Sequence, residues 1–244
     1  MTDTTPLEDF PRPNVAVDLA LLTVVPAQDS SSGTERLCVL VQRRTAKPRG
    51  SVLPGRFIRE RHTIEETVQE VLELKLGVST GRVSPTLLRT FSTPGRDARA
   101  WTISIAHAVT LPAGQVAGID GELVPIDLAG GLATGEKLLF DHGEIVREAA
   151  LRIRERYESA PDPDGLLEEP FTLAQLRHLH EAVLGELLRK DTFSRRMKGQ
   201  LEGLTSKDGS ELTRTSIGRP AQLFRKKDVD GKPGTTRWQL PRAQ

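Results

Sequence analysis

Basic side chains that can bind phosphate groups gather in two parts of this 244-residue sequence. One set surrounds the Leu-Pro-Gly motif at residues 53–55, and the other lies near the C-terminus among hydroxyl-bearing neighbours. Guanidinium and ammonium groups hold phosphate through charge-assisted hydrogen bonds. The first set is Arg43, Arg44, Arg56, Arg59 and Lys75. The second set is Thr192, Ser194, Arg195, Arg196, Lys198, Arg214, Thr215, Arg219 and Lys226. The first set is the candidate effector-binding set, and the second is the candidate DNA-binding set.

The charge of the chain is distributed unevenly, although its formal net charge is only +1. Residues 187–244 contain 14 Lys and Arg against 6 Asp and Glu, whereas residues 1–186 contain 20 against 27. A basic C-terminal piece on an acidic body indicates a nucleic-acid-binding module joined to a regulatory domain. A solvated basic tail would give the same balance, so the charges alone leave both interpretations open.

The composition is that of an ordinary globular protein, with 37% hydrophobic and 27% charged residues. No apolar run approaches the roughly 20 residues that a membrane span needs. The N-terminal segment is polar and acidic and lacks the apolar core of a secretory signal. A single cysteine, Cys38, excludes an internal disulfide. These features predict a cytoplasmic protein without a membrane partner.

The first 140 residues are expected to form a sheet with a helix packed on it. Runs rich in β-branched residues predict strands at 15–25, 37–44, 56–59, 86–92, 101–111 and 123–127. Thr63 and Glu66 form a Thr-x-x-Glu capping box, which predicts that a helix begins there. Its buried stripe is expected at Ile64, Val68, Val71, Leu72 and Leu76. This order of elements predicts an α+β sandwich with a mixed sheet.

The last 100 residues are expected to form helices and a hairpin. A helix at 141–157, with Asp141 as its N-cap, precedes the breaking segment SAPDPDG. Thr172 predicts the start of the next helix, and Gly185 its end. A basic helix at 191–202 capped by Asp191 and a hairpin with strands near 210–216 and 220–227 are predicted to follow. This order is the layout of a winged helix-turn-helix domain.

Residues 56–78 resemble a Nudix box, Gly-x5-Glu-x7-Arg-Glu-U-x-Glu-Glu-x-Gly-U, where U is a bulky aliphatic residue. The Gly, loop Glu and helix Arg positions carry Arg56, His62 and Glu70, and the three helix carboxylate positions carry Val71, Leu74 and Lys75. Carboxylates at i, i+3 and i+4 share one helix face and hold Mg²⁺, which prefers oxygen ligands. Two aliphatic side chains and a lysine cannot replace them. No metal, no cofactor and no catalytic residue are therefore expected.

Two alternatives apply to this box: a shifted register that restores carboxylates, and surface drift as the origin of Lys75. A shift by one residue would put Glu70 and Glu73 on carboxylate positions, but it would also put Leu76 on the Gly position and conflict with the helix start at Thr63. Lys75, at a former carboxylate position, can meet a phosphate directly without a metal ion. Simple drift of the surface after the loss of catalysis would leave the same residues.

The C-terminal half resembles the Nudix-related transcriptional regulators of NAD metabolism, the NrtR family. The resemblance lies in Phe-Asp-His at 140–142 with the helix after it, in residues 171–197, and in IGRPAQLFR at 217–225. The motifs VQRR at 41–44 and Pro-Gly-Arg-Asp at 94–97 add to it. It covers about residues 14–227.

The resemblance implies an α+β fold, in which an N-terminal Nudix-like α/β/α sandwich is followed by a C-terminal winged helix-turn-helix domain. The expected divisions are a flexible N-terminus at 1–13, an effector-binding domain at 14–160 that includes the linking helix 141–157, a DNA-binding domain at 166–227 and a flexible basic tail at 228–244.

The resemblance also implies a function. It predicts a homodimeric, ligand-responsive repressor of genes for NAD biosynthesis or salvage, not an enzyme. Its partners would be double-stranded DNA with a palindromic operator and a nucleotide effector such as ADP-ribose or NAD. An active ADP-ribose pyrophosphatase with a C-terminal interaction domain, and a regulator of another pathway such as sugar metabolism, are the alternatives.

Within the basic C-terminal set, Ser194, Arg195 and Lys198 are expected on the polar face of the second helix, where an arginine can read guanine. Arg219, between Gly218 and Pro220, suits insertion into a narrow minor groove or simply the turn of a wing. Arg214 and Lys226 are expected to contact phosphates without sequence preference.

Overall fold

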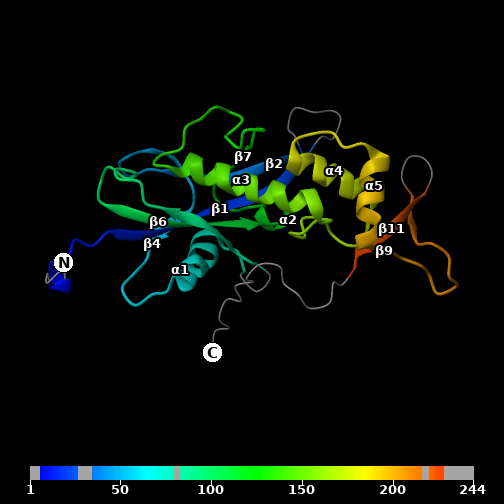
Figure 1. Ribbon diagram of the computed structural model, residues 1–244, viewed down its shortest axis with the longest axis horizontal. Coiled ribbons are helices and arrows are strands. Elements are labelled where there is room, and N and C mark those ends of the chain that lie inside the picture. The colour runs from blue at the N-terminus through cyan, green and yellow to red at the C-terminus, as the bar shows by residue number, and fades with distance from the viewer. Residues whose placement is uncertain (1–5, 27–34, 80–82, 216–219, 228–244) are drawn as a thin grey trace, which may run out of the picture.

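The computed structural model describes residues 6–26, 35–79, 83–215 and 220–227. A large mixed sheet with helices on both faces occupies one end of the molecule, and a smaller sheet with α5 (Lys190–Met197) occupies the other (Figure 1). Among the described residues, no helix is long and apolar enough to cross a membrane. The predicted α+β class is confirmed.

The large sheet has seven strands, with β3-β2-β1-β6-β5 in its main order. They are β1 (Asn14–Pro26), β2 (Glu35–Arg44), β3 (Gly50–Val52), β4 (Gly55–Phe57), β5 (Thr86–Phe91), β6 (Thr102–Thr110) and β7 (Glu122–Pro125). Only β1 and β6 pair in parallel, so the predicted mixed sheet is confirmed. Strand β3 was not predicted, because three residues beside a glycine- and proline-containing loop carry no strand pattern.

Side chains of β1 alternate between two buried layers. Leu19 and Leu21 face a cluster formed with α1 (Ile64–Glu70) and α2 (Ala113–Val116), whereas Ala20 and Leu22 face a cluster formed with α3 (His142–Ser159). Strand residues alternate between faces with a period of two, so an uninterrupted apolar strand must be covered on both sides. The result is a helix, sheet, helix sandwich.

The predicted capping box of α1 is confirmed. Thr63 Oγ1 accepts the N–H of Glu66 at 3.1 Å, and Glu66 Oε2 accepts the N–H of Thr63 at 2.8 Å. The helix then widens into a π-helical turn, Val71–Lys75. A π turn adds a residue per hydrogen bond and shifts the faces that follow. Positions 71, 74 and 75, which were expected to share one face, therefore differ in their surroundings.

The smaller half is a winged helix. It contains β8 (Phe171–Thr172), α4 (Leu173–Leu184), α5, a 3-10 turn (Lys198–Gln200), β9 (Leu201–Gly203), β10 (Thr213–Arg214) and β11 (Ala221–Lys226). The predicted start of α4 at Thr172 and its end at Gly185 are confirmed, with Gly185 at φ 77°. The prediction for the basic helix was wrong at both ends. Its N-cap is Arg189, which makes no side-chain cap, and Glu202 lies on β9 because Leu201 to Gly203 pair with β11.

The hydrophobic core continues across the boundary predicted at 159–165. Leu179 and Val183 of α4 lie in the same buried cluster as Ala20 and Leu22 of β1. Figure 1 shows α4 next to α3 over the sheet. A separate cluster around Phe193 forms the core of the winged helix itself. The winged helix is thus attached to the sheet through α4.

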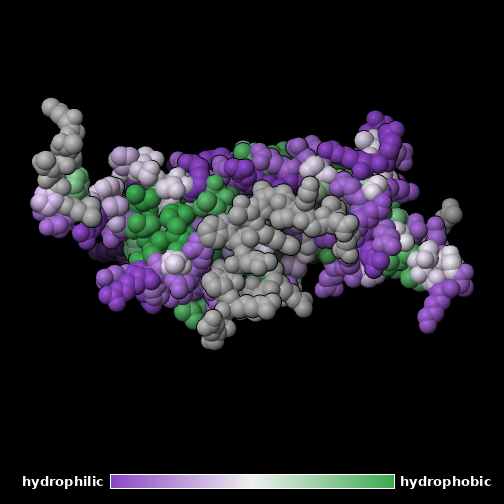
Figure 2. Space-filling view, turned by 60° about the horizontal axis from the view of Figure 1, so that its bottom comes forward, coloured by the Kyte–Doolittle hydropathy of each residue, from purple (hydrophilic) through white to green (hydrophobic). Residues whose placement is uncertain are grey.

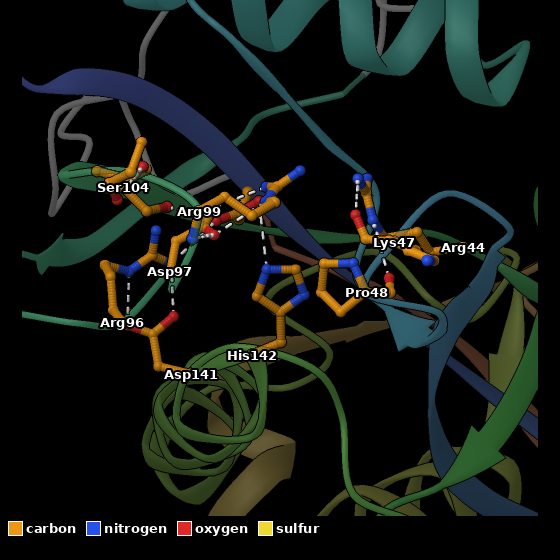
Figure 3. A network of polar contacts seen from close by, with 12 residues as sticks. Arg44, Lys47, Pro48, Arg96, Asp97, Arg99, Ser104, Asp141 and His142 are labelled. Atoms are coloured by element: carbon orange, nitrogen blue, oxygen red, sulfur yellow. Dashed lines mark hydrogen bonds and ion pairs between the residues drawn. The ribbon is translucent and has the colours of Figure 1, made fainter.

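A buried polar network ties the start of α3 to the sheet (Figure 3). Asp18, in the apolar strand β1, accepts a hydrogen bond of 2.7 Å from Ser104 Oγ and one of 3.3 Å from Arg96 Nη2. Arg96 also donates from Nε and Nη2 to the carboxylate of Asp141, at 2.7 and 2.5 Å. His142 Nε2 lies 3.5 Å from Asp18 Oδ1. The network joins two strands, the Pro-Gly-Arg-Asp loop and α3.

Asp141 was expected to cap α3 with its side chain, but it makes no such hydrogen bond. Its two carboxylate oxygens are both taken by Arg96, because a bidentate guanidinium contact is stronger than a bond to a neutral N–H. His142 begins α3, as predicted, and its Nδ1 accepts the N–H of Leu53 at 2.8 Å. Both residues therefore hold α3 against the sheet.

The network keeps Asp18 ionised. Burial raises the pKa of Asp18, but the hydrogen bond and charge of His142, the hydroxyl of Ser104 and the charge of Arg96 outweigh burial and hold that pKa at about 2. Because this value lies below the ordinary 3.8, the ionised carboxylate stabilises the fold above about pH 4. That contribution is lost as the pH falls from about 4 to about 2.

Arg96→Met removes the cation that Asp18 and Asp141 share. We expect the free energy of unfolding to fall by about 3–5 kcal/mol at neutral pH, because both carboxylates lose a partner while nearly buried. The difference from wild type should shrink below about pH 4, as Asp18 takes up a proton. Urea unfolding curves measure both effects. Arg152→Met, on the exposed side of α3, is the control, and an equal loss there would contradict this account.

Candidate functional site

The three box positions that would carry carboxylates do not form a metal site. Val71 is fully buried in the core, Leu74 is 74% exposed, and the Lys75 ammonium donates to the Gly55 carbonyl at 2.9 Å. None of these side chains supplies the oxygen ligand that Mg²⁺ requires. In the described part of the chain, no group of three or more His, Cys, Asp or Glu residues is placed to hold a metal ion. The residues present do not fit the ion that the box implies.

Glu70, at the position of the box arginine, is surrounded by basic groups. Its carboxylate lies 2.5 Å from Arg56 Nη1, 3.6 Å from Arg59 Nη1 and 3.5 Å from His62 Nδ1. The loop Glu position carries His62 and the helix Arg position carries Glu70, and these two side chains lie close together. Two guanidinium groups already pair with Glu70, which disfavours the shifted box that would give this carboxylate to a metal.

Lys75 lies close to other charges at the end of the box helix. Burial lowers the pKa of Lys75; the charge of Asp18 opposes this effect, and those of Arg44 and Arg56 add to it. A Cβ atom on Gly55 would lie 2.3 Å from Asp18 Oδ1, so only glycine allows the chain to pass here. A phosphate beside Lys75 would offset the positive charges of Arg44 and Arg56 that act on its ammonium. This place is the candidate anion site.

The structure does not bring all five predicted effector residues together. Arg44 donates to the Lys47 and Pro48 carbonyl oxygens, at 3.2 and 3.1 Å, so its own loop orients it (Figure 3). Arg43 precedes it on β2 and therefore faces the other side of the strand. There its guanidinium lies 3.1 Å from Glu136. Arg43 is thus separate from the other four residues.

Helix α5 turns a basic face to solvent. Phe193 and Met197 are buried in the winged-helix core and set the orientation of the helix. By helical spacing Arg195 lies opposite them, with Lys198 nearby, and both are exposed, whereas Ser194 is half-buried. The end of the molecule that carries α5 is mostly hydrophilic (Figure 2). Arg195 is therefore the best placed side chain for a base contact.

Two other predicted residues of α5 lie on its flank. Thr192 and Arg196 are exposed, but they line a cavity of about 410 Å³ together with Tyr157 and Glu158 from the end of α3. They face the junction between the two halves, one turn apart on the helix. Their position differs from that of Arg195, which points away from the core.

The remaining predicted DNA residues have different surroundings. Arg214 donates to Gln175 Oε1 and the Pro170 carbonyl, both at 3.0 Å, so it supports the base of the hairpin. The Lys226 ammonium donates to the Asp162 carbonyl at 3.0 Å and lies near two carboxylates. This internal pairing argues against the phosphate contact expected of Lys226. Thr215 is exposed, and Arg219 lies outside the described residues.

The network of Asp18 was not identified from the sequence. A single aspartate within an apolar strand was a usable signal, because a buried charge needs a partner. The Pro-Gly-Arg-Asp loop supplied a candidate partner in Arg96. Which of the many arginines approaches Asp18 depends on the fold, and no spacing in the sequence shows it.

Known proteins are similar to both the Nudix-like half and the winged helix of this chain. Residues 165–225 match the family model of the NrtR DNA-binding winged helix domain. Over 228 residues the chain is 28% identical to the ADPR responsive transcriptional repressor NtrR of Acinetobacter baylyi, which covers 89% of this chain and 83% of the relative.

The structure is also similar to solved structures over most of their length. A MutT/nudix family protein from Enterococcus faecalis matches with a TM-score of 0.68, at 20% identity over 91% of this chain and 90% of its own, which shows the fold alone. Shewanella oneidensis NrtR complexed with a 27mer DNA matches with a TM-score of 0.66, at 30% identity over 87% of this chain and 93% of its own. The likeness to NrtR spans nearly the whole of that protein, and this chain belongs to the NrtR family.

Proposed function

We propose that this chain is a transcriptional repressor that binds an operator through its winged helix and releases it when its Nudix-like domain binds ADP-ribose. The observation that carries the proposal is the exposed basic face of α5 on a domain that matches the NrtR winged helix. The Acinetobacter relative is named an ADPR responsive repressor, and the Shewanella protein was solved with DNA, which supports both parts.

In this proposal the effector is held by its phosphates. Lys75 and Arg44 supply positive charge. Arg56 and Arg59 add to it by exchanging their contacts with Glu70 for contacts with a phosphate. The Lys75 ammonium, now bonded to the Gly55 carbonyl, gains a stronger acceptor in a phosphate oxygen, because a bond between two ions exceeds one to a neutral carbonyl. The lysine takes the part that a metal ion would have, so effector binding needs no Mg²⁺.

The repressor is proposed to act as a homodimer on a palindromic operator. One winged helix offers few base contacts, so useful specificity calls for two copies on one duplex. A symmetric dimer places its half-sites about one helical turn apart, or a multiple of that. We propose genes of NAD biosynthesis or salvage as targets, and the cytoplasm as the place of action.

The first test concerns hydrolysis of ADP-ribose, which the alternative function, an active pyrophosphatase, would require. We expect no release of AMP from ADP-ribose in the presence of Mg²⁺ above the rate in buffer, because the helix that would hold the ion offers Val71, Leu74 and Lys75. Chromatography of the reaction mixture, with an active Nudix hydrolase as positive control, measures this. Turnover by the wild-type protein that EDTA abolishes would establish a pyrophosphatase instead.

The second test concerns base reading by α5. Arg195→Ala should weaken operator binding by about 1–3 kcal/mol and binding to random duplex by less. Fluorescence anisotropy with both duplexes at one salt concentration measures the two affinities. Arg152→Ala, exposed on α3, is the matched control and should bind like wild type. Equal losses of Arg195→Ala on both duplexes would assign this residue to phosphate contacts alone.

The third test concerns the cation at the former carboxylate position. In EDTA, ADP-ribose should weaken operator binding of the wild-type protein by about 5- to 150-fold, the range of ordinary allosteric coupling. Lys75→Glu should abolish most of this response, because its carboxylate repels the phosphates. Lys137→Glu, exposed before α3, makes the same charge change and should respond like wild type. An unchanged response in Lys75→Glu would place the effector elsewhere.

A further inference from the structure

Arg154, in the last third of α3, joins the winged helix to the Nudix-like sheet. Its Nε donates to the Val183 carbonyl of α4 at 3.1 Å. Its Nη1 and Nη2 donate to the Leu128 and Asp127 carbonyls, both at 2.8 Å, in the turn that follows β7. One rigid guanidinium on α3 thus binds three carbonyl oxygens, one from the end of α4 and two from the turn after β7.

The carbonyl of Val183 belongs to the last turn of α4, where helix carbonyls lack partners in the helix and carry partial negative charge. A cation is well suited to bind there. Immediately beyond it, Gly185 reverses the chain at φ 77°, and a Cβ atom at this position would lie 2.5 Å from Leu128 Cδ2. The end of α4 therefore abuts the same turn that Arg154 holds.

The turn after β7 is itself rigid. Asp127 Oδ1 accepts the N–H of Gly131 at 2.9 Å, and the Asp127 carbonyl accepts the N–H of Gly130 at 3.0 Å. Strand β7 pairs with β2, with Val39 opposite Val124. Since β2 ends at Arg44, beside the candidate anion site, one strand connects that site to the turn. Backbone pairing and hydrogen bonds therefore form a continuous path from that site to the end of α4.

Open space borders the end of α4 on one side. A cavity of about 600 Å³ lies between the start of β2, the turn after β7 and the C-terminal end of α4. Leu128 and Leu187, which line it from the two sides, are 70% and 90% exposed. Buried packing therefore holds α4 on its other face, through Leu179 and Val183, and the hydrogen bonds of Arg154 join its end to the turn beside this cavity.

Asp162 forms a second link to the winged helix, but its partners differ from those of Arg154. This residue is fully buried, accepts the Tyr157 hydroxyl at 2.7 Å, and offers its backbone carbonyl to Lys226 at 3.0 Å. These partners belong to the end of α3 and to the winged helix. Asp162 therefore fastens the winged helix to α3 and does not reach the sheet, whereas Arg154 does.

We propose that Arg154 is the positioning residue that couples the effector site to the DNA-binding surface. It holds the end of α4 against the turn after β7 in one of two arrangements, and the effector changes which arrangement is favoured. A ligand can act on distant wings only through an element with two discrete arrangements that it biases. The inference rests on the proposed function, because it needs an effector that alters operator binding.

The test compares three variants with the wild-type protein by operator anisotropy with and without ADP-ribose. Arg154→Met keeps most of the apolar stem and removes all three hydrogen bonds. Arg154→Lys keeps the charge but can satisfy fewer carbonyls. Arg152→Met changes a neighbouring arginine whose partners, Glu148 and Glu155, lie on α3 itself. Calorimetry with ADP-ribose and thermal unfolding accompany each protein.

The readout is the ratio of operator Kd with and without ADP-ribose. We expect the ratio of Arg154→Met to fall to less than about a third of the wild-type ratio, with Arg154→Lys between the two and Arg152→Met like wild type. ADP-ribose affinity should stay within about threefold of wild type in all of them. If Arg154→Met fails to fold, the intermediate ratio of Arg154→Lys decides the matter.

The outcomes separate the two claims. A wild-type protein that ignores ADP-ribose overturns the proposed function, and this inference with it. A wild-type response that Arg154→Met and Arg154→Lys share in full overturns the inference alone. A reduced ratio in Arg152→Met as well would assign the loss to a general weakening of α3 and would also overturn it.

Discussion

The buried carboxylate of Asp18 is the group on which the arrangement of the sheet, the candidate anion site and α3 depends. An ion inside an apolar sheet is tolerated only with partners around it. Here they come from β6, from the Pro-Gly-Arg-Asp loop and from the start of α3. Gly55 must also pass beside the same carboxylate, and its carbonyl accepts the Lys75 ammonium. The candidate anion site and the first turn of α3 are therefore built around one charge.

This construction explains how a fold associated with hydrolysis can serve as a sensor. Once the helix carboxylates are replaced, a bound phosphate needs another source of positive charge, and Lys75 stands at one of the vacated positions. Continuity of the core from β1 through α3 to α4 provides a packed path between the sheet and the winged helix. A regulator gains from such continuity, because two independently packed domains joined by a flexible linker would not transmit a change at one to the other.

Periodicity and capping residues predicted most of the elements, because local chemistry determines them. Thr63 and Thr172 cap their helices as expected, and Gly185 ends α4. Features decided by partners distant in sequence were missed. Asp141 binds Arg96 instead of capping its helix, and Lys226 binds Asp162. The π turn at Val71–Lys75 was missed as well, because the helical spacing of the apolar residues does not reveal it. The candidate site was predicted as a set of residue types, and its connection to α3 required the fold.

The central claim is that this protein recognises ADP-ribose with its own cations in place of a metal ion. Calorimetric titration of ADP-ribose into the wild-type protein, once in EDTA and once in excess Mg²⁺, tests it most directly. We predict a measurable affinity in EDTA that is equal to, or tighter than, the affinity with Mg²⁺, because magnesium neutralises the phosphates that Lys75 would bind. Binding that occurs only when Mg²⁺ is present would contradict the account.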